Sequence, residues 1–351
     1  MRIAQIAPLI ESVPPKLYGG TERVVAYLTE ALIDLGHEVT LFASGDSSTR
    51  ARLISTAPRA LRLHPVAMPQ LYTLAMIERV RQLAYEFDIL HFHEVDFLHF
   101  PVFRDQRDRT ITTFHGRLDL PDLDLLARTF PDMPAVSISN AQRTPLPGLG
   151  WIGTVYHGLP SDLLALSTEP KGYLVFLGRI SPEKGPDTAI RIARRAGLPL
   201  RIAAKVDRAD QEYFNHVIRP LLREPGIEFL GEIGEAEKAE LLGGALAMLF
   251  PIDWPEPFGL VMIEAMACGT PVVAFRRGSV PEVLEDGVTG LIVENEKEAV
   301  ACLERVPMLD RCAIRREFER RFTADRMAHD YLRLYWRQLE RLASWSEGAA
   351  T

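Results

Sequence analysis

The sequence is poor in cysteine and has no long uncharged apolar segment. Its three cysteines, Cys268, Cys302 and Cys312, are neither closely spaced nor accompanied by histidines in a ligand pattern, which argues against a disulfide framework and a structural zinc site. No apolar run is long enough to span a bilayer, and the first residues, MRIAQIAPLI, lack the regions of a signal peptide. We therefore expect a cytoplasmic protein in a reducing compartment, without a transmembrane segment; peripheral contact with a membrane stays open.

The chain also has no excess of positive charge. It carries 40 Lys and Arg against 47 Asp and Glu, a formal net charge of -7, which gives no support to a nucleic-acid partner. Hydrophobic residues make up 47% and charged residues 25% of the 351 residues, which is enough apolar surface for sizeable cores. This length exceeds what one core usually supports, so we expect about two globular domains.

Short apolar runs alternate with amphipathic stretches along the whole chain, a pattern typical of parallel sheets covered by helices. The pattern starts twice, which predicts two α/β units. In the first unit, Thr21 is the expected N-cap of a helix over 21–35 that Gly36 closes. Strands are expected at 2–7, 37–43, 89–93, 110–114, 135–139 and 153–157 in the first unit and at 173–177, 200–204, 227–230, 247–251 and 271–275 in the second, with a helix near 187–196.

The expected domains are residues 1–160 and 161–323, followed by a C-terminal stretch, 324–351. The segment 160–171, rich in Ser, Pro and charged residues, is the best candidate linker. The C-terminal stretch reads as a long amphipathic helix with aromatic residues on its apolar face, so it must dock on one of the units. Its pattern alone leaves open which unit that is.

A dinucleotide-binding fingerprint, GxGxxG, is missing at both places where the first strand of a unit turns into a helix. Gly19 and Gly20 stand at the first of these turns, and the sequence GRISPEKG, residues 178–185, stands at the second. This absence counts against a nicotinamide-dependent dehydrogenase. Gly19 and Gly20 precede a helix N-terminus, where backbone amides can approach a phosphate or a sugar.

Two glutamates, Glu256 and Glu264, stand eight positions apart around an expected helix start. Glu264 has apolar neighbours in the sequence, so its carboxylate needs a polar partner. Glu256 lies in the turn WPEPFG, where the backbone amides of Phe258, Gly259 and Leu260 suit a phosphate. The pattern is typical of a site for an anion and a polyol whose hydroxyls donate to the carboxylates. The alternative is a surface Glu256 and a buried Glu264 paired with an arginine elsewhere.

Charged and polar residues that follow other strands also indicate a ligand site. Ligands of open α/β sheets bind beyond the carboxyl ends of the strands. Arg179 and Lys184 flank the turn after 173–177 and suit a diphosphate whose negative charge grows as it leaves, although solvated surface charges have the same pattern. His115 follows the strand at 110–114. There it can bond a substrate hydroxyl, carry a proton or satisfy a neighbouring backbone group.

A further polar group surrounds the end of the strand at 89–93. His91 and His93 share one face of this strand, a spacing that raises the question of a metal, but Glu94 points away and no third ligand is in register. We therefore expect no metal and no cofactor at this place. His93, Glu94 and Asp96 are interpreted as contacts of an acceptor substrate.

Taken together, these features resemble the retaining glycosyltransferases of family four. The motifs that carry the resemblance are Gly19-Gly20, TFHG at 113–116, SISNAQR at 137–143, GRISPEKG at 178–185, EPFGLVMIEAMACGTPVV at 256–273 and VPEVLEDGVTGLIV at 280–293. They span nearly the whole chain, and the EPFG block with its second glutamate is the most specific of them. The resemblance implies the GT-B fold, an α/β architecture of two facing Rossmann-like domains with parallel sheets and a deep inter-domain cleft, the first domain binding the acceptor and the second the nucleotide sugar. It also implies that the C-terminal helix, 324–351, crosses back to the first domain, which would explain its aromatic face.

The resemblance also implies roles for single residues. Arg179 and Lys184 would bind the donor diphosphate, Glu264 the ribose hydroxyls, and Glu256 the transferred sugar, which His115 would contact during the reaction. The implied catalytic residues are thus His115, Arg179, Lys184 and Glu256. The implied donor-binding set also includes Gly19, Gly20, Phe258, Gly259, Leu260, Val261 and Glu264.

The same resemblance implies a mechanism. The acceptor oxygen would attack the sugar on the face from which the nucleoside diphosphate leaves, so that the anomeric configuration is retained. No divalent metal is implied, because two cations and a helix dipole perform its electrostatic task. UDP-glucose and GDP-mannose donors both fit the motifs. The sequence does not identify the hydroxyl acceptor, which is a small molecule, a saccharide or a natural product.

One departure concerns His157-Gly158, where many members have Asn-Gly. The region 44–87 is also short and has no obvious basic amphipathic helix, which disfavours a lipid-linked acceptor. Two alternative functions stay open on the same fold. One is a non-hydrolysing nucleotide-sugar epimerase, and the other is a catalytically inactive nucleotide-sugar binding protein.

Overall fold

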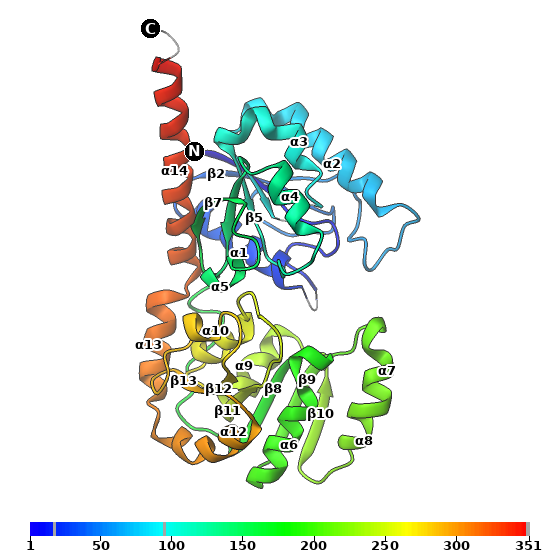
Figure 1. Ribbon diagram of the computed structural model, residues 1–351, viewed down its shortest axis with the longest axis vertical. Helices are drawn as coiled ribbons and strands as arrows, with labels where there is room; N and C mark the ends of the chain where they lie inside the picture. Colours follow the sequence, from blue (N-terminus) through cyan, green and yellow to red (C-terminus); the bar gives the residue numbers. More distant parts are fainter. Residues whose placement is uncertain (17–18, 94–95, 349–351) are drawn as a thin grey trace. The chain divides into compact units, whose positions relative to one another are not determined.

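The computed structural model describes residues 1–16, 19–93 and 96–348, and the chain divides into two compact units (Figure 1). Unit 1 comprises Met1–Gly158 together with Ala324–Thr351, and unit 2 comprises Leu159–Thr323. The boundary after Gly158 lies two residues before the expected one. Among the described helices, none is both long and apolar enough to span a bilayer. The cytoplasmic location inferred from the sequence stays a prediction.

Unit 1 contains a seven-stranded sheet in the order β3-β2-β1-β4-β5-β6-β7, and each strand pairs in parallel with its neighbours. Its strands are β1 (Arg2–Ile6), β2 (Glu38–Phe42), β3 (Arg52–Ile54), β4 (Ile89–His93), β5 (Thr110–Thr113), β6 (Pro134–Ser137) and β7 (Gly150–Thr154). Its helices are α1 (Gly20–Asp34), α2 (Pro69–Leu83), α3 (His99–Phe103), α4 (Leu123–Thr129), α5 (Asn140–Arg143) and α14 (Ala324–Gly348), with short 3₁₀ helices η1 (Ala84–Glu86) and η2 (Arg104–Arg109).

Unit 2 contains a six-stranded parallel sheet in the order β10-β9-β8-β11-β12-β13. Its strands are β8 (Tyr173–Arg179), β9 (Leu200–Lys205), β10 (Ile227–Gly231), β11 (Ala245–Phe250), β12 (Val272–Phe275) and β13 (Gly290–Val293). Its helices are α6 (Pro186–Ala196), α7 (Gln211–Tyr213), α8 (Arg219–Leu221), α9 (Glu235–Gly243), α10 (Leu260–Ala267), α11 (Val280–Val283), α12 (Glu296–Cys302) and α13 (Arg311–Arg321), with η3 (Pro182–Lys184), η4 (Arg208–Asp210), η5 (Phe214–Ile218) and η6 (Leu303–Met308).

Both sheets have the doubly wound order in which the chain starts at the centre, moves to one edge and then returns to the other side. The order reverses between β1 and β4 in unit 1 and between β8 and β11 in unit 2. The crevice beyond the carboxyl ends of the strands at such a reversal is where these folds bind ligands. Each unit is thus a Rossmann-like domain with one such place.

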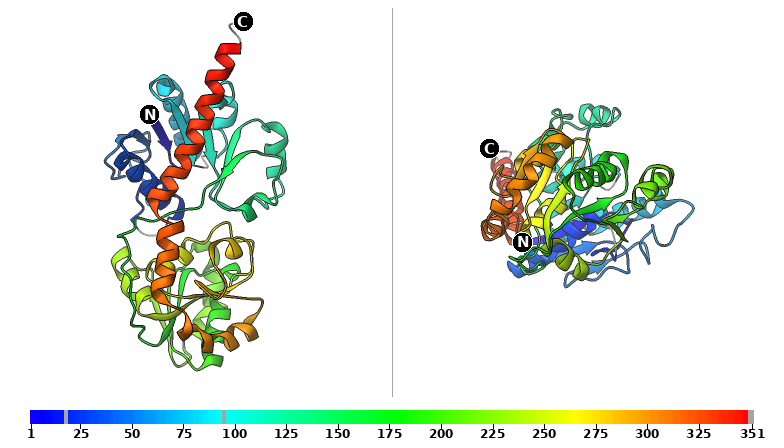
Figure 2. Two further views of the ribbon diagram at one scale, coloured as in Figure 1. Left: turned by 90° about the vertical axis from the view of Figure 1, so that its left-hand side faces the viewer. Right: turned by 90° about the horizontal axis from the view of Figure 1, so that it is seen from below.

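The C-terminal helix α14 packs on unit 1, where it contacts α1 and η2 (Figure 2). Met327, Tyr331 and Tyr335 on this helix are completely buried, and Leu334 packs against Gly153 of β7. The apolar face of this helix, whose partner the pattern alone left open, therefore covers the first sheet. Trp336, by contrast, is half exposed.

Three details differ from the expectations. The helix α1 begins at Gly20 and has Gly19 as its N-cap without a side-chain bond, so the prediction of Thr21 as N-cap is wrong. Strand β7 starts three residues earlier than expected, because its two glycines have low strand propensity and hid its beginning. The edge strands β3 and β13 were missed, since each is short and borders turn residues.

Candidate functional site

The loops that follow β8 and β11 meet at the carboxyl edge of the second sheet. Two contacts join them. The backbone N–H of Asp253 donates to the carbonyl oxygen of Glu183 at 2.9 Å, and the ammonium of Lys184 forms an ion pair with the carboxylate of Glu256. The structure therefore brings Lys184 and Glu256 together at the switch point of the sheet, as expected for residues of one ligand site.

Glu256 is a buried acceptor with a fixed orientation. Only 7% of its surface is exposed, so the alternative of a surface glutamate in a turn is wrong. Its Oε2 accepts hydrogen bonds from the Lys184 ammonium and from Nε1 of Trp254, the latter at 2.7 Å. The same ammonium lies over the Trp254 ring, 4.5 Å from its centroid. Lys184 is thus held in place by a charge and by an aromatic face.

The backbone of Glu256 is fixed by the turn at Gly278 and Ser279. Gly278 has a φ of 50°, and a Cβ there would overlap the backbone nitrogen and oxygen of Glu256. The N–H of Ser279 donates to the carbonyl oxygen of Glu256 at 2.9 Å, and its hydroxyl donates to the carbonyl oxygen of Phe258 at 2.9 Å. Only glycine allows the two backbones to approach this closely.

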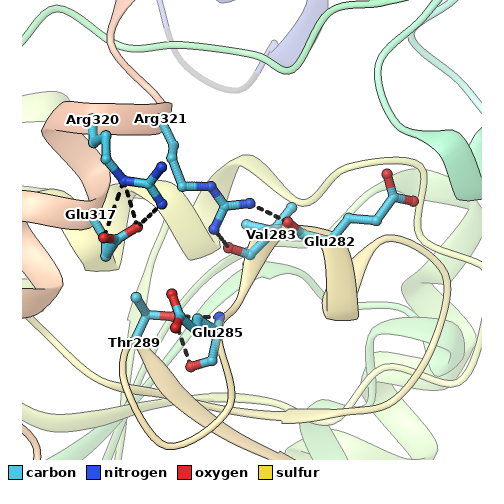
Figure 3. A network of polar contacts seen from close by, with 7 residues as sticks. All are labelled: Glu282, Val283, Glu285, Thr289, Glu317, Arg320 and Arg321. Atoms are coloured by element: carbon cyan, nitrogen blue, oxygen red, sulfur yellow. Dashed lines mark hydrogen bonds and ion pairs between the residues drawn. The ribbon is translucent and has the colours of Figure 1, made fainter.

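Helix α13 holds α11, the short helix that begins after Ser279, in place (Figure 3). The guanidinium of Arg321 donates to the carbonyl oxygens of Glu282 and of Val283, the latter at 3.1 Å. The hydroxyl of Thr289 accepts from the N–H of Glu285 at 2.8 Å and closes the next turn. These contacts satisfy the carbonyls at the end of α11, so the segment behind Glu256 is rigidly attached to its own unit.

Helix α10 opens directly beside Glu256. Gly259 is its N-cap in the left-handed conformation, with a φ of 81°, and no acidic residue occupies its first turn. Phe258 is buried, whereas Gly259, Leu260 and Val261 are partly exposed. The first amides of a helix lack intrahelical acceptors and carry the positive end of the dipole, so this start is suited to bind an anion next to Glu256 and Lys184.

Glu264 is buried in α10 and pairs with Lys238 of α9. Their side chains are 4% and 11% exposed, and Nζ and Oε1 are 2.7 Å apart. The same Nζ lies 3.3 Å from Oε1 of Glu235. The predicted polar partner of Glu264 thus exists, but it is a lysine and not the arginine considered as an alternative. Lys238 was missed because nothing in the pattern of an amphipathic helix distinguishes it from a solvated lysine.

Arg179 ends β8 among carboxylates. Its Nη2 donates to Oε1 of Glu183 at 2.5 Å, and its other nitrogens lie 3.9 Å from Asp207 and from Asp210. Burial raises the pKa of Asp210, and the Arg179 charge opposes this shift. The positive charge of Arg179 is therefore offset in the free protein, and a diphosphate would have to replace acidic partners to bind it.

In unit 1, three histidines gather beyond the ends of β4, β5 and β7. Nδ1 of His93 and Nε2 of His115 are 2.9 Å apart, and the rings of His115 and His157 stack with their centroids 5.2 Å apart. Burial lowers the pKa of His115 to about 3, so its ring is neutral. His93 and His157 are buried, whereas His115 is partly exposed. The role of His115 in binding a hydroxyl stays a prediction, and the ring of His157 lies directly against it.

The expected acceptor contacts are not gathered on one surface. His93 is completely buried behind His115, so a supporting role for it agrees better with its position than direct contact with an acceptor. Asp96 is exposed, has a φ of 51° and accepts a hydrogen bond from the Thr73 hydroxyl at 3.4 Å. Glu94 lies outside the described residues.

The turn at Gly19 and Gly20 lies next to buried acidic side chains. Gly19 is in close contact with Pro15 and Glu22. Burial raises the pKa of Glu22, and Glu11, which pairs with Arg62 at 3.0 Å, adds to that shift. Carboxyl groups beside a helix N-terminus accept hydrogen bonds from hydroxyls and repel phosphate, so this turn suits a sugar better than a phosphate.

Two consecutive Rossmann-like domains with a ligand site of this kind in the second define the GT-B class of glycosyltransferases, and known proteins agree with this assignment. Residues 18–144 match the model "Glycosyltransferase Family 4", and residues 165–309 match the model "Glycosyl transferases group 1". The chain belongs to glycosyltransferase family four.

Two similar proteins agree with this membership, and a third shares the fold. The chain is 29% identical to a phosphatidyl-myo-inositol mannosyltransferase of Mycobacterium leprae over 91% of this chain and 90% of that protein. It is 25% identical to AviGT4, a glycosyltransferase involved in avilamycin A biosynthesis, with a TM-score of 0.73 over 96% of this chain and 98% of the other. The Anabaena protein HepE, solved with UDP and glucose, is 19% identical with a TM-score of 0.70 over 98% of this chain and 100% of the other, which shows a shared fold.

Proposed function

We propose that this glycosyltransferase moves a hexosyl group from a UDP- or GDP-sugar to a hydroxyl of an acceptor, with retention of the anomeric configuration and without a metal. The observation that carries the proposal is the junction of Lys184, Glu256 and the start of α10 at the switch point of the second sheet. A cation, a helix N-terminus and a buried carboxylate are the groups that a sugar diphosphate needs.

The chemistry of each group supports its proposed role. Departure of the nucleoside diphosphate places growing negative charge on the leaving oxygen, and the Lys184 ammonium together with the α10 amides stabilises it. The Glu256 carboxylate accepts hydrogen bonds from hydroxyls of the transferred sugar, and Glu264 accepts them from the ribose. Arg179 adds positive charge once a diphosphate replaces its acidic partners. In this scheme fixed positive groups of the protein perform the task that a divalent cation performs elsewhere.

The relatives support a nucleotide-sugar donor and leave a choice among bases. HepE has been solved with UDP and glucose, and the Mycobacterium leprae relative is a phosphatidyl-myo-inositol mannosyltransferase. The first experiment is therefore a thermal-shift screen of UDP, GDP, UDP-glucose and GDP-mannose, with and without EDTA. A ligand at one hundred times its dissociation constant adds about 2.7 kcal/mol to the free energy of unfolding. The absence of stabilisation by every nucleotide, or its loss in EDTA, would contradict the proposal.

The reaction itself is followed with the donor that the screen selects. Incubation with hydroxyl acceptors should give a glycoside whose anomeric configuration, measured by NMR coupling constants, equals that of the donor. Incubation without an acceptor should leave the donor sugar intact except for slow hydrolysis. Conversion of the donor to an isomer would instead identify a nucleotide-sugar epimerase, and an unchanged donor in every incubation would indicate a binding protein.

A pair of lysine variants tests the role of Lys184. We expect Lys184→Ala to lower kcat by about 100-fold and to change donor affinity less, because the charge that it stabilises grows toward the transition state. Lys171→Ala is the matched control. Lys171 also pairs with a glutamate of unit 2, Glu240, at 2.9 Å, but both side chains are exposed, so its loss should leave kcat unchanged. A change in KM alone for Lys184→Ala would refute the assignment.

A further inference from the structure

A continuous row of buried polar side chains connects α14 to His115 within unit 1. Its first part joins His115 to Tyr335. Nε2 of His115 lies 2.9 Å from Nδ1 of His93, Nε2 of His93 lies 2.6 Å from Oε1 of Gln5, and Nε2 of Gln5 lies 3.2 Å from the hydroxyl of Tyr335. All of these residues except His115 are completely buried.

The second part of the row continues from Tyr335 to Tyr331. The Tyr335 hydroxyl lies 2.7 Å from Nδ1 of His91, and Nε2 of His91 lies 2.8 Å from the hydroxyl of Thr113. That hydroxyl lies 3.0 Å from the hydroxyl of Tyr331. Strands β1, β4 and β5 and helix α14 all contribute to the row. Buried polar groups need such partners, and here each one has its partner within the row.

The orientation of the Gln5 amide determines the direction of the bonds at His93 and His115. Its Nε2 faces Tyr335 and can only donate, so its Oε1 faces His93 and can only accept. His93 must therefore carry its proton on Nε2. A neutral His93 then has a lone pair on Nδ1, which accepts the proton of His115 Nε2. In the other direction, the Tyr335 hydroxyl accepts from Gln5 and is hydrogen-bonded to His91, and Thr113 is hydrogen-bonded to His91 and to Tyr331. The Gln5 amide does not determine which of these groups donates.

We propose that Gln5, His93 and Tyr335 are positioning residues that hold His115 in the tautomer protonated on Nε2, so that Nδ1, a buried atom in the free protein, carries the lone pair with which His115 would accept a hydrogen bond from a substrate hydroxyl. The part that concerns the substrate rests on the proposed function, whereas the tautomer is a property of the free protein. The hydroxyl would belong to the sugar or to the acceptor, the two groups of a glycosyl transfer that carry O–H donors.

Two observations agree with a fixed neutral ring. Stacking of His115 on His157, at an interplanar angle of 13°, restricts the rotation of its imidazole. Burial keeps the pKa of His115 far below neutrality, so the ring does not become a double donor in the physiological range. In a cationic ring both nitrogens would donate, and the acceptor at Nδ1 would be lost.

The tyrosines at α14 provide a matched pair of variants, because both are completely buried and each loses one oxygen on change to phenylalanine. Tyr335→Phe removes the acceptor of Gln5 Nε2, so the amide can turn over and reverse the bonds at His93 and His115. Tyr331→Phe removes only the terminal hydroxyl, beyond Thr113. Gln5→Met is a second route, since it removes the acceptor of His93 directly. Thermal unfolding of each variant checks that unit 1 remains folded.

The measurement is a long-range ¹H–¹⁵N spectrum of the free protein labelled at histidine, with the His115 signals assigned from the spectrum of His115→Gln. We expect His115 with the proton on Nε2 in the original protein and in Tyr331→Phe. In Tyr335→Phe and Gln5→Met we expect a mixture of tautomers and a fall in kcat/KM of about tenfold, the size of one hydrogen bond. A proton on Nδ1 in the original protein, or identical spectra of Tyr335→Phe and Tyr331→Phe, would overturn the proposal. If His115 has the expected tautomer but the protein transfers no sugar, the proposed function is refuted and the assignment of the positioning residues is not.

Discussion

Replacement of Lys238 by methionine should destabilise unit 2 strongly. Lys238 and Glu264 form a buried ion pair with 2.7 Å between Nζ and Oε1, and their side chains are 11% and 4% exposed. Methionine keeps most of the apolar contacts of the lysine stem but leaves the Glu264 carboxylate without its cation. Removal of one partner of a buried pair costs about 3–5 kcal/mol, because the remaining charge is neither solvated nor compensated.

The double variant Lys238→Met/Glu264→Met separates the structural task of the pair from its proposed binding task. Removal of both charges leaves two apolar side chains of similar length in contact, so most of the lost stability should return. Donor affinity should not return, because the ribose hydroxyls still lack a charged acceptor worth about 1.5–3 kcal/mol. This loss corresponds to a dissociation constant about 10- to 150-fold higher.

Two assays measure the two effects independently. Hydrogen exchange of peptides from α9 and α10 as a function of urea reports the stability of unit 2 separately from that of unit 1. Calorimetric titration with the nucleotide selected by the screen reports affinity. Normal donor affinity in the stable double variant would refute the binding role of Glu264 and reduce it to a structural partner of Lys238. Unchanged stability of Lys238→Met would refute the account of the pair as a buried one.

Two further predictions concern a glycine turn in unit 2 and a buried histidine in unit 1. Gly278→Ala should lower donor affinity and destabilise unit 2, because its Cβ would overlap the Glu256 backbone. The control Gly287→Ala, at a φ of 79° with open space around it, should lower the free energy of unfolding by only about 1–2 kcal/mol and leave the donor affinity measured by calorimetric titration intact. Equal donor affinities of the two variants would contradict this prediction. The pKa of His115 is lowered to about 3, against about 6.5 when unfolded, so the unfolded chain binds the extra proton between these values and stability is lost as the pH falls below about 6.5. At pH 5 the loss from this residue is about 2 kcal/mol, and urea unfolding of His115→Gln should show a correspondingly weaker dependence on pH; an equal dependence would refute it.

Most of the fold could be predicted from the sequence, because buried parallel strands leave a direct signal in apolar runs. The strand at Ile89–His93 was predicted with the bounds that the structure has. The features that the local pattern did not predict are those that tertiary contacts decide. The short edge strand β3 was missed, and only the family resemblance, not the pattern, indicated that α14 docks on the first unit, because both depend on surfaces that the local pattern does not contain.

The site residues that could be predicted from the sequence are those that directly follow a strand. Lys184 and Glu256 could be assigned to one ligand site because both stand after strands of the same sheet. Lys238 and Gln5 could not, since each lies inside a regular element and becomes important only through a partner from another element. His93 was interpreted as an acceptor contact because the sequence shows that it stands close to other polar residues. The sequence does not show how deeply its side chain is buried.

The free site of unit 2 is already balanced in charge, and this has a consequence for catalysis. Glu256 neutralises Lys184, and Glu183 neutralises much of Arg179. We expect an arriving diphosphate to take over these cations while sugar hydroxyls and Trp254 Nε1 satisfy the released Glu256 carboxylate. Such an exchange of partners yields little net binding energy in the ground state, because one set of ion pairs replaces another. The charge on the leaving diphosphate then grows as the sugar bond breaks, and its attraction to Lys184 grows with it, which is why the loss of this lysine should reduce turnover more than affinity.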